Sequence, residues 1–370
     1  MASLSAEERT ALRDAVHRLL ADRCTEADVR RTMDTPEGYD PNLWARLSQM
    51  GIPGLLIAET HGGSGAGPLE LEAIMEEVGA ALLCSPLLAS SVIAATLLAA
   101  LSDQAANARL LPAVASGDAI ATVALTGDQG QWTADGVEVT ASPAPEGWVL
   151  DGTAAHVLHA QNADILLVVA HTAAGLEVFE VDPGVESLTI EASPTFDHTL
   201  RLARLTFTAV PARRLEAAGP VWDAVRAALD MALVALAGEQ AGATRRCLDF
   251  TIDYAKTRIQ FGRPIGGFQA IKHMAADLLL ESESATSAAR NAAARLAEGS
   301  PDAPAAISLA AFACADAFVT TTAASIQMHG GIAFTWVHPA HLYLRRARAD
   351  AQLFGAPAFH RERYLQQLGA

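Results

Sequence analysis

This sequence lacks most of the features that mark secreted, zinc-binding or nucleic-acid-binding proteins. Its 4 cysteines (Cys24, Cys84, Cys247 and Cys314) are far apart and form no C-x-x-C pair, so neither a disulfide framework nor a cysteine zinc site is expected. Lys and Arg total 26 against 42 Asp and Glu, which gives a formal net charge of −16. That charge argues against nucleic acid or an anionic membrane as a partner. No metal site is expected.

A membrane-spanning run is also missing from the sequence pattern. The most apolar run, Leu87 to Leu101, is about fifteen residues long and is interrupted by Ser90 and Ser91, whereas roughly twenty apolar residues are needed to cross a bilayer. We therefore expect a buried helix there and no membrane insertion. Met1 to Asp14 is charged and helical in character, unlike a secretory signal, so we expect a cytoplasmic protein.

The residues that are present fall into three blocks of different texture. Hydrophobic residues make up 51% of the 370 and charged residues 18%, which is a globular composition. Residues 1–117 show helical spacing of apolar side chains, and residues 118–215 contain short β-rich runs separated by turn residues. Residues 216–370 return to long helices rich in Ala and Leu, expected over 223–258 and 304–328. This order predicts an α+β fold with a central antiparallel β-barrel or sandwich.

The most informative stretch is residues 254–273, which read YAKTRIQFGRPIGGFQAIKH. A helix carrying Lys256 and Arg258 leads into a turn interrupted by Gly and Pro, and Phe268 and Gln269 open a second helix. A guanidinium binds phosphate oxygens in bidentate fashion, so a fixed turn that aims Arg258 outward predicts a phosphate contact. From the residues alone, the alternative is an ordinary helix hairpin with a solvated arginine.

A second motif, residues 327–335, reads QMHGGIAFT and follows one of the long helices. Paired glycines such as Gly330 and Gly331 let backbone N–H groups approach a bulky anion closely. The alternative is a glycine that simply ends the helix.

These two motifs, and the order of helices, strands and helices over essentially the whole chain, resemble the acyl-CoA dehydrogenase family, including its actinobacterial fatty and steroid acyl-CoA members. These flavoproteins desaturate acyl-CoA thioesters between the α and β carbons. The resemblance implies an N-terminal helical domain (1–117), a central β domain (118–215) and a C-terminal four-helix bundle (216–370). It also implies FAD, whose pyrophosphate the two motifs hold for a neighbouring subunit. The cofactor contacts implied by these motifs are Arg258, Phe261, Gln269, Gln327, Gly330 and Gly331.

The β block is less similar to the family than the two motifs are. Family members carry a Thr-Glu-Pro-Gly-Ala-Gly-Ser-like loop and later a Gly-Thr-Lys-aromatic motif, both beside a subunit's own flavin. Here residues 125–131 read LTGDQGQ and residues 151–158 read DGTAAHVL. Thr126 and Thr153 are the cofactor contacts implied on this side. The Gly-Ser loop is largely gone and His156 replaces the aromatic residue, so this half of the site is eroded.

The reaction of the family needs a carboxylate that takes the α-proton while the β-hydrogen leaves as hydride. At the three positions where relatives carry that Glu, this chain has Gly355, Ala232 and Val337. Glu239 lies seven residues after Ala232, two helical turns along the same face, and is the candidate base. The alternative is a buried or interfacial ion pair, with a partner among Arg245, Arg246 and Arg258.

Three functions remain open from the sequence. The first is FAD-dependent α,β-dehydrogenation of a fatty or steroid side-chain acyl-CoA by a subunit of an oligomer. The second is a non-catalytic subunit of an α2β2 dehydrogenase that lends its flavin contacts to a partner. The third is a related flavin-dependent oxidase. The resemblance implies an acyl-CoA substrate, a homologous subunit in a homo- or hetero-oligomer, and an electron-transfer protein as acceptor.

Overall fold

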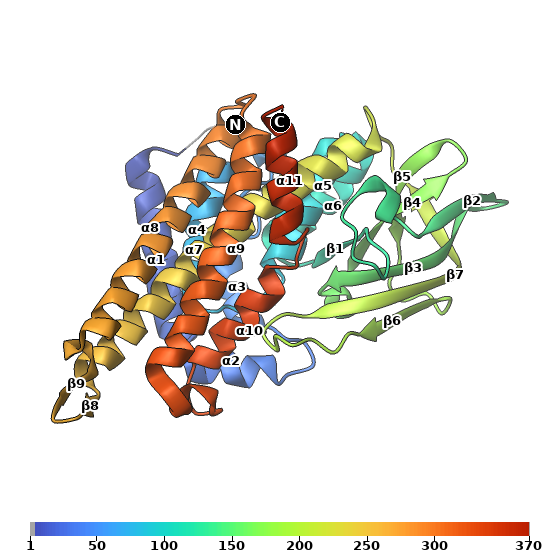
Figure 1. Cartoon of the computed structure of the whole chain (residues 1–370). Helices are drawn as coiled ribbons and strands as arrows, with labels where there is room; N and C mark the ends of the chain where they lie inside the picture. The colour runs from blue at the N-terminus through green and yellow to red at the C-terminus, as the bar shows by residue number, and fades with distance from the viewer. Residues whose placement is uncertain (1–3, 370) are drawn as a thin grey trace. The chain divides into compact units, whose positions relative to one another are not determined.

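A computed structural model describes residues 4–369 of the chain, and its contacts divide them into two compact units (Figure 1). Residues 32–67 and 84–232 form one unit, which we call the strand unit. Residues 4–31, 68–83 and 233–369 form the other, which we call the helical unit. The three domains predicted along the sequence do not correspond one to one with these units, because the contacts divide the N-terminal block (1–117) between the two units. The three domain boundaries therefore stay a prediction.

The strand unit begins with short helices whose ends follow from local sequence. Asp40 caps one of them, since its carboxylate accepts from the backbone N–H groups of Asn42 and Leu43 at 2.8 and 3.3 Å. The predicted buried helix over 87–101 is confirmed: its residues from Leu88 to Ala95 are buried. The helices of this unit are α3 (Pro41–Gln49), η1 (Glu59–His61), η2 (Leu88–Ala94), α5 (Ala95–Leu101), α6 (Gln104–Ser116) and the first part of α7 (Val221–Thr257), up to Ala232.

Seven strands of this unit form one sheet. They are β1 (Ala121–Ala124), β2 (Thr140–Ala144), β3 (Gly147–Leu158), β4 (Ile165–Thr172), β5 (Gly175–Val181), β6 (Leu188–Ala192) and β7 (Leu202–Arg214). The path β4–β2–β3–β7–β5 returns to β4, so the sheet closes into a small barrel filled by apolar side chains. Short 3-10 turns, η3 (Ala134–Gly136) and η4 (Ala160–Asn162), connect strands.

The predicted antiparallel barrel is confirmed only in part. Most neighbouring strands are antiparallel, but β4 pairs in parallel with β1, over Ala121↔Ile165 to Ala124↔Val168, and with β2 at Thr140↔His171. Parallel neighbours need crossover connections, and these lie in the long segments between the strands. The sequence pattern of alternation cannot distinguish the two directions, because side chains alternate in both.

The helical unit contains the remaining helices. They are α1 (Ala6–Arg23), α2 (Glu26–Met33, up to residue 31), α4 (Pro68–Ala80), α7 (Val221–Thr257, from residue 233), α8 (Gln269–Ala297), α9 (Ala303–His329), α10 (Ala340–Asp350) and α11 (Pro357–Gln367). Helix α9 packs against α8, α10 and α11, and buried Leu248, Leu278 and Met328 join α7, α8 and α9 (Figure 1). The C-terminal helices form the predicted bundle, which α1 and α4 extend.

Helices α4 and α7 cross at very short range because glycines line the crossing. A Cβ added at Gly79 would lie 1.9 Å from the backbone oxygen of Glu239, and one at Gly242 would lie 1.8 Å from that of Glu76. Any larger residue would force the helices apart. Glycine therefore fixes how α4, from early in the chain, docks onto α7.

The segment 303–334 is long and apolar enough to cross a membrane, judged by length and composition alone. Half of its most apolar 18-residue stretch is buried inside the protein. This segment consists of α9, which packs inside the bundle, and the following η6 (Gly330–Phe334), which is mostly exposed. Its apolar character is that of a central helix, which must be apolar on several faces.

Candidate functional site

The two glycine-containing motifs meet at one end of the helical unit, where α7 and α9 end side by side. The rings of Tyr254 and His329 stack with centroids 4.4 Å apart, and the Tyr254 hydroxyl donates to the His329 carbonyl at 3.4 Å. One turn earlier the hydroxyl oxygens of Thr251 and Ser325 are 2.7 Å apart. The structure thus brings together Arg258, which follows Tyr254, and the glycines that follow His329.

Aromatic and imidazole rings packed around the buried His329 hold this end in place. The Nδ1–H of His329 donates to the Ser325 carbonyl at 2.8 Å, and its ring lies 4.4 Å from that of His338 and 5.8 Å from that of Phe250. Burial lowers the pKa of His329 against the opposing effect of the Ser325 carbonyl, so the imidazole is neutral at pH 7. A neutral, hydrogen-bonded imidazole fixes the start of Gly330–Phe334.

The predicted turn between the two helices is a small β-hairpin. Strand β8 (Ile259–Gln260) pairs with β9 (Arg263–Pro264), and η5 (Ile265–Gly267) leads into α8. The two turn residues, Phe261 and Gly262, have φ of +52° and +77°, as a type I′ turn requires. This left-handed backbone is unfavourable for Phe261, whose side chain is 92% exposed. Strain and exposure of a large apolar residue together are typical of a functional surface.

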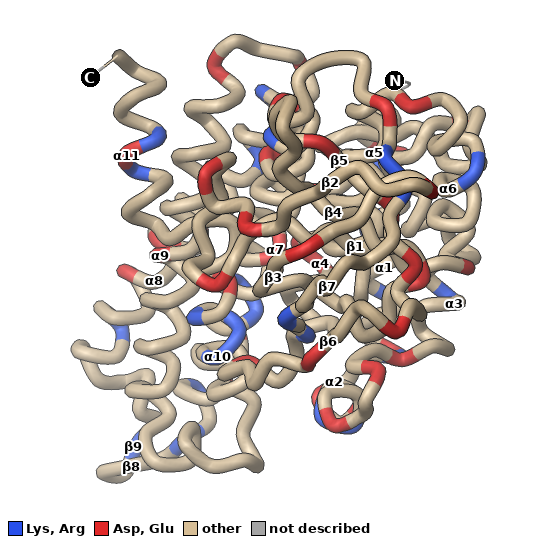
Figure 2. Tube along the Cα trace, turned by 90° about the vertical axis from the view of Figure 1, so that its right-hand side faces the viewer, with Lys and Arg blue, Asp and Glu red and all other residues tan. Residues whose placement is uncertain are grey.

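This end of the unit is basic although the chain as a whole is acidic. From Tyr254 to Ala276 the sequence contains Lys256, Arg258, Arg263 and Lys272 and no Asp or Glu, and Figure 2 shows basic positions around β8 and β9. Lys256 pairs with Asp253 at 3.4 Å, and the Arg263 guanidinium lies 4.1 Å from the centroid of the Phe268 ring. Within residues 4–369, the exposed Arg258 guanidinium has no acidic partner.

The glycines beside it leave room for an anion. Gly330 has φ of +69°, and a Cβ built at Gly330 or Gly331 would meet no atom within 4 Å. Gln327 precedes these glycines in sequence, and Gln269 follows the turn that contains Arg258. Both side chains are exposed, so their amides are open to a ligand. An unpaired guanidinium, open glycine backbone and amide donors are the groups that bind a pyrophosphate. The residues present therefore fit the phosphate portion of FAD.

The other two predicted cofactor contacts, Thr126 and Thr153, lie in the strand unit. The Thr126 hydroxyl is buried and donates to the Gln131 carbonyl at 2.8 Å, and that of Thr153 donates to Glu138 Oε2 at 3.2 Å. A Cβ at Gly127 would lie 1.9 Å from the Glu138 carboxyl carbon, so this carboxylate packs against the loop. Both hydroxyls are used within the protein, and a negative charge lies beside them.

Glu239, the predicted base, is buried with 4% of its surface exposed and forms an ion pair with Arg346 of α10, itself 4% exposed. The predicted ion-pair alternative is confirmed, but its expected partners, Arg245, Arg246 and Arg258, were wrong. Arg346 lies 107 residues away in sequence, and only the fold brings it to α7. A catalytic role for Glu239 stays a prediction. Glu239 lies roughly 28 Å along α7 from Arg258, at 1.5 Å per residue over 19 residues.

The three positions where the family resemblance predicts a base differ in whether a glutamate side chain would fit there. Ala232 is fully buried and Val337 is 79% exposed. Gly355 has φ of +118°, and a Cβ there would lie 2.6 Å from Cδ1 of Phe359. A glutamate at 355 would require both an unfavourable backbone and displacement of that ring. The local backbone therefore disfavours a carboxylate side chain at position 355.

Two residues of the site could not be found from sequence patterns. Arg346 lies in a run of basic residues on α10, with nothing to single it out, and its role depends on burial. Glu138 lies just before β2 in the short run over 137–140 and has no motif around it. Each acts through a contact distant in sequence, which local spacing does not report.

Comparison with known proteins identifies the family. The profile of the acyl-CoA dehydrogenase N-terminal domain matches residues 6–118, and that of the C-terminal domain matches residues 222–369. Acyl-CoA dehydrogenase IpdE2 of Mycobacterium tuberculosis is 36% identical over 95% of this chain and 94% of its own length. Acyl-CoA dehydrogenase FadE27 of the same organism is 32% identical over 88% of this chain and 87% of its own length.

Solved structures that are similar to this chain indicate the same family. A variant of the Tcur3481–Tcur3483 steroid ACAD is 31% identical with a TM-score of 0.87, and the match covers 98% of each chain. The ChsE4–ChsE5 complex from Mycobacterium tuberculosis is 29% identical with a TM-score of 0.90, over 100% of this chain and 99% of that one. Butyryl-CoA dehydrogenase from Megasphaera elsdenii, at 22% identity and a TM-score of 0.88, shares the fold. This chain belongs to the acyl-CoA dehydrogenase family of oxidoreductases.

Proposed function

We propose that this chain is a subunit of an oligomeric, FAD-dependent acyl-CoA dehydrogenase that acts on a fatty or steroid side-chain thioester. Its part is to bind the pyrophosphate of a flavin held by a neighbouring subunit. The observation that carries the proposal is the meeting of Arg258 and Gly330–Gly331 at one basic end of the helical unit, fixed by the Tyr254–His329 contact.

The residues at this end would act by binding and orienting. Arg258 would place its unpaired guanidinium against phosphate oxygens, and the backbone of Gly330 and Gly331 would approach them without steric hindrance. Phe261 would cover an aromatic or apolar part of the cofactor, since its side chain is 92% exposed and its ring meets that of Phe268 edge-on, with centroids 6.1 Å apart. When bound, FAD supplies the acceptor for the hydrogen that leaves the β carbon as hydride.

A specific observation favours a second candidate, a subunit without a complete site of its own. The carboxylate of Glu239 is engaged by Arg346, the backbone at Gly355 disfavours a glutamate, and Thr126 and Thr153 direct their hydroxyls to protein acceptors. Two similar solved structures, Tcur3481–Tcur3483 and ChsE4–ChsE5, carry the names of two different chains. Under this candidate the partner would supply the base and hold the flavin.

The flavin content of the purified protein distinguishes the two candidate functions, an autonomous enzyme and a subunit without a complete site. The chain is purified alone and together with a homologous acyl-CoA dehydrogenase chain from the same organism, and native mass and FAD per chain are measured for each. An autonomous enzyme should hold one FAD per chain when alone. A lending subunit should be flavin-poor alone and should give one FAD per pair when combined. A monomer that binds FAD fully would contradict both candidates, because the shared contacts would then be unnecessary.

The role of Arg258 is tested by Arg258→Ala in whichever assembly binds FAD. Loss of one charge-assisted contact of about 1.5–3 kcal/mol should weaken FAD binding by roughly ten-fold to a hundred-fold. Arg245→Ala is the matched control, because Arg245 is an exposed arginine of α7, the helix that ends just before Arg258, and it pairs with Glu283 at 2.6 Å. Equal FAD affinity of both variants and the unsubstituted protein would refute the pyrophosphate assignment.

A further inference from the structure

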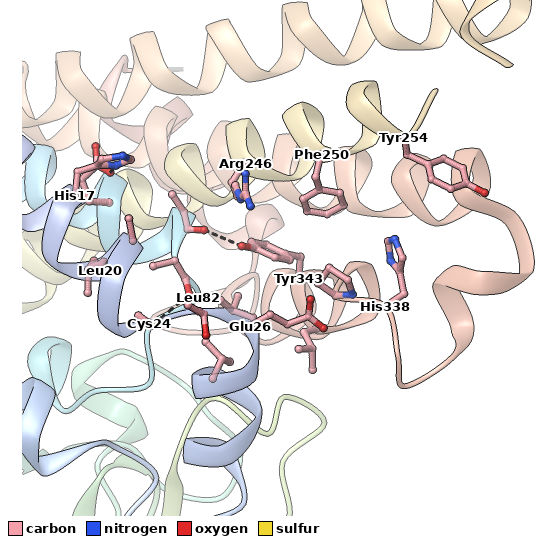
Figure 3. A pocket seen from close by; sticks show the side chains of 18 of the residues that line it. His17, Leu20, Cys24, Glu26, Leu82, Arg246, Phe250, Tyr254, His338 and Tyr343 are labelled. Carbon is pink, nitrogen blue, oxygen red and sulfur yellow. Dashed lines mark hydrogen bonds and ion pairs between the residues drawn. The ribbon is translucent and has the colours of Figure 1, made fainter. Parts of the chain in front are cut away.

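The helical unit contains a cavity of about 590 Å³, and the residues proposed to contact the flavin do not line it. Its walls come from α1, the start of α2, the end of α4, α7, α9 and α10 (Figure 3). A volume of this size is in the range of cavities that bind small molecules. Arg258, Phe261, Gln269 and the Gly330–Gly331 pair are not among its lining residues.

Most of the lining is apolar or aromatic. Leu20 and Leu82 form one side, and Phe250 and Tyr343, with ring centroids 5.5 Å apart, form another (Figure 3). The Tyr343 hydroxyl donates to the Ala80 carbonyl at 2.7 Å, which fixes that ring and uses its proton. The apolar lining predicts a ligand with a hydrocarbon body.

The acidic residues of the lining are already paired. Glu77 lies 2.8 Å from His17 and 3.9 Å from Arg13, and Glu26 pairs with Arg30 at 2.7 Å. Their negative charges are therefore engaged by neighbouring basic groups and are not free to engage a cation in the cavity.

Arg246 is the basic group left over. Figure 3 shows its side chain projecting from α7 toward Tyr343, whose hydroxyl it contacts. Within the part of the chain that the structure describes, residues 4–369, no carboxylate pairs with Arg246. Burial lowers the pKa of the lining residues His329 and His338, so neither supplies fixed positive charge at pH 7. The cavity thus combines an apolar body with one uncompensated guanidinium.

We infer that this cavity binds an amphipathic monocarboxylate, with the carboxylate on Arg246 and the hydrocarbon body against Leu20, Leu82 and Phe250. A guanidinium in a partly apolar setting binds a carboxylate in bidentate fashion, and the apolar wall favours a chain or ring behind it. The inference goes beyond the proposed function, since it uses none of the proposed flavin contacts.

Binding of decanoate to the full chain, in the oligomer that it forms, is measured by isothermal titration calorimetry. Two further probes, 1-decanol and decyltrimethylammonium, share the hydrocarbon body but lack the negative charge. Arg246→Gln removes the charge and retains a polar side chain at an exposed position. Arg245→Gln is the matched control, because the neighbouring Arg245 pairs with Asp249 and Glu283 and does not line the cavity. Ala21→Trp narrows the cavity from α1.

Decanoate should bind saturably, and Arg246→Gln should weaken it about ten-fold or more, equivalent to ~1.4 kcal/mol. Arg245→Gln should leave decanoate binding unchanged, and Ala21→Trp should weaken both decanoate and decanol. Decyltrimethylammonium should bind more weakly than either. Absence of saturable decanoate binding would overturn the inference. So would an equal effect of the two arginine variants, or decanoate binding that Ala21→Trp does not change.

Discussion

The ion pair between Glu239 and Arg346 should be strongly coupled, because both side chains are almost fully buried, at 5% and 4% exposure. Replacing Arg346 by Met would leave the Glu239 carboxylate buried without that partner. Removing one member of a buried pair typically lowers the free energy of unfolding by about 3–5 kcal/mol. Glu239→Gln retains the shape and should cost less, about 1–3 kcal/mol.

The double variant Glu239→Gln/Arg346→Met should be more stable than the sum of the single losses implies, by about 1–3 kcal/mol. Arg346 has further interactions, and the double-mutant cycle cancels them because they are lost in both arms. The measurement is urea unfolding of all four proteins at pH 7 and one protein concentration, followed by circular dichroism.

The exposed pair Arg245–Glu283 is the control for this cycle. Its side chains are 51% and 61% exposed, so its coupling should not exceed ~1 kcal/mol. If the Glu239–Arg346 losses add to within about 0.5 kcal/mol, the two charges do not stabilise each other and the reasoning fails. That result would favour the hypothesis that Glu239 is a catalytic base over the hypothesis that it has a structural role.

Three further predictions concern other positions of the helical unit. Gly79→Ala should destabilise the protein by several kcal/mol, since its Cβ would overlap the Glu239 carbonyl; Gly219→Ala, with nothing within 4 Å, should change unfolding in urea little. Burial, and then Glu76, raises the pKa of Glu72 to about 9 from 4.5. Between those pH values the unfolded chain releases a proton that the folded protein keeps, so stability should fall with rising pH, by up to ~1.4 kcal/mol per unit. Glu72→Gln should flatten this slope and stabilise the protein at pH 8; an unchanged slope from pH 5 to 8.5 would contradict the assignment. Gly355→Glu should lower the thermal midpoint without raising acyl-CoA-dependent flavin reduction, and a gain of activity would show that the backbone there can adapt.

Local sequence predicted the parts of the fold that depend on local chemistry. The long helices and the presence of short strands in the central block followed from spacing, because the buried face of a helix or strand appears as a periodicity in its own sequence. Strand β6 (Leu188–Ala192) has a weak sequence signal, because it is short and mostly exposed at its far end. The parallel pairings of β4 were missed because strand direction leaves no mark on alternation.

In the candidate site, too, residues in local motifs could be predicted from the sequence, whereas residues that depend on contacts distant in sequence could not. Arg258 and Gly330 lie in motifs that the sequence shows directly, and the structure adds that Tyr254 and His329 hold them together. The partner of Glu239 could not be predicted, because Arg346 reaches it only through the packing of α10 on α7. The left-handed backbone of Phe261 was also unforeseen, since glycine is the residue that ordinarily occupies such a position.

The tight glycine crossing of α4 on α7 has a consequence for synthesis on the ribosome. Helix α4 ends at Ala80, but the residues of α7 that cross it, Gly238 to Gly242, are synthesised only roughly 160 residues later. At 5–20 residues per second, the apolar face of α4 stays without its docking helix for roughly 8–32 s. Throughout that time it must be shielded by transient contacts or by a chaperone. A nascent chain stalled before residue 233 should therefore be the form most prone to aggregate or to recruit a holdase.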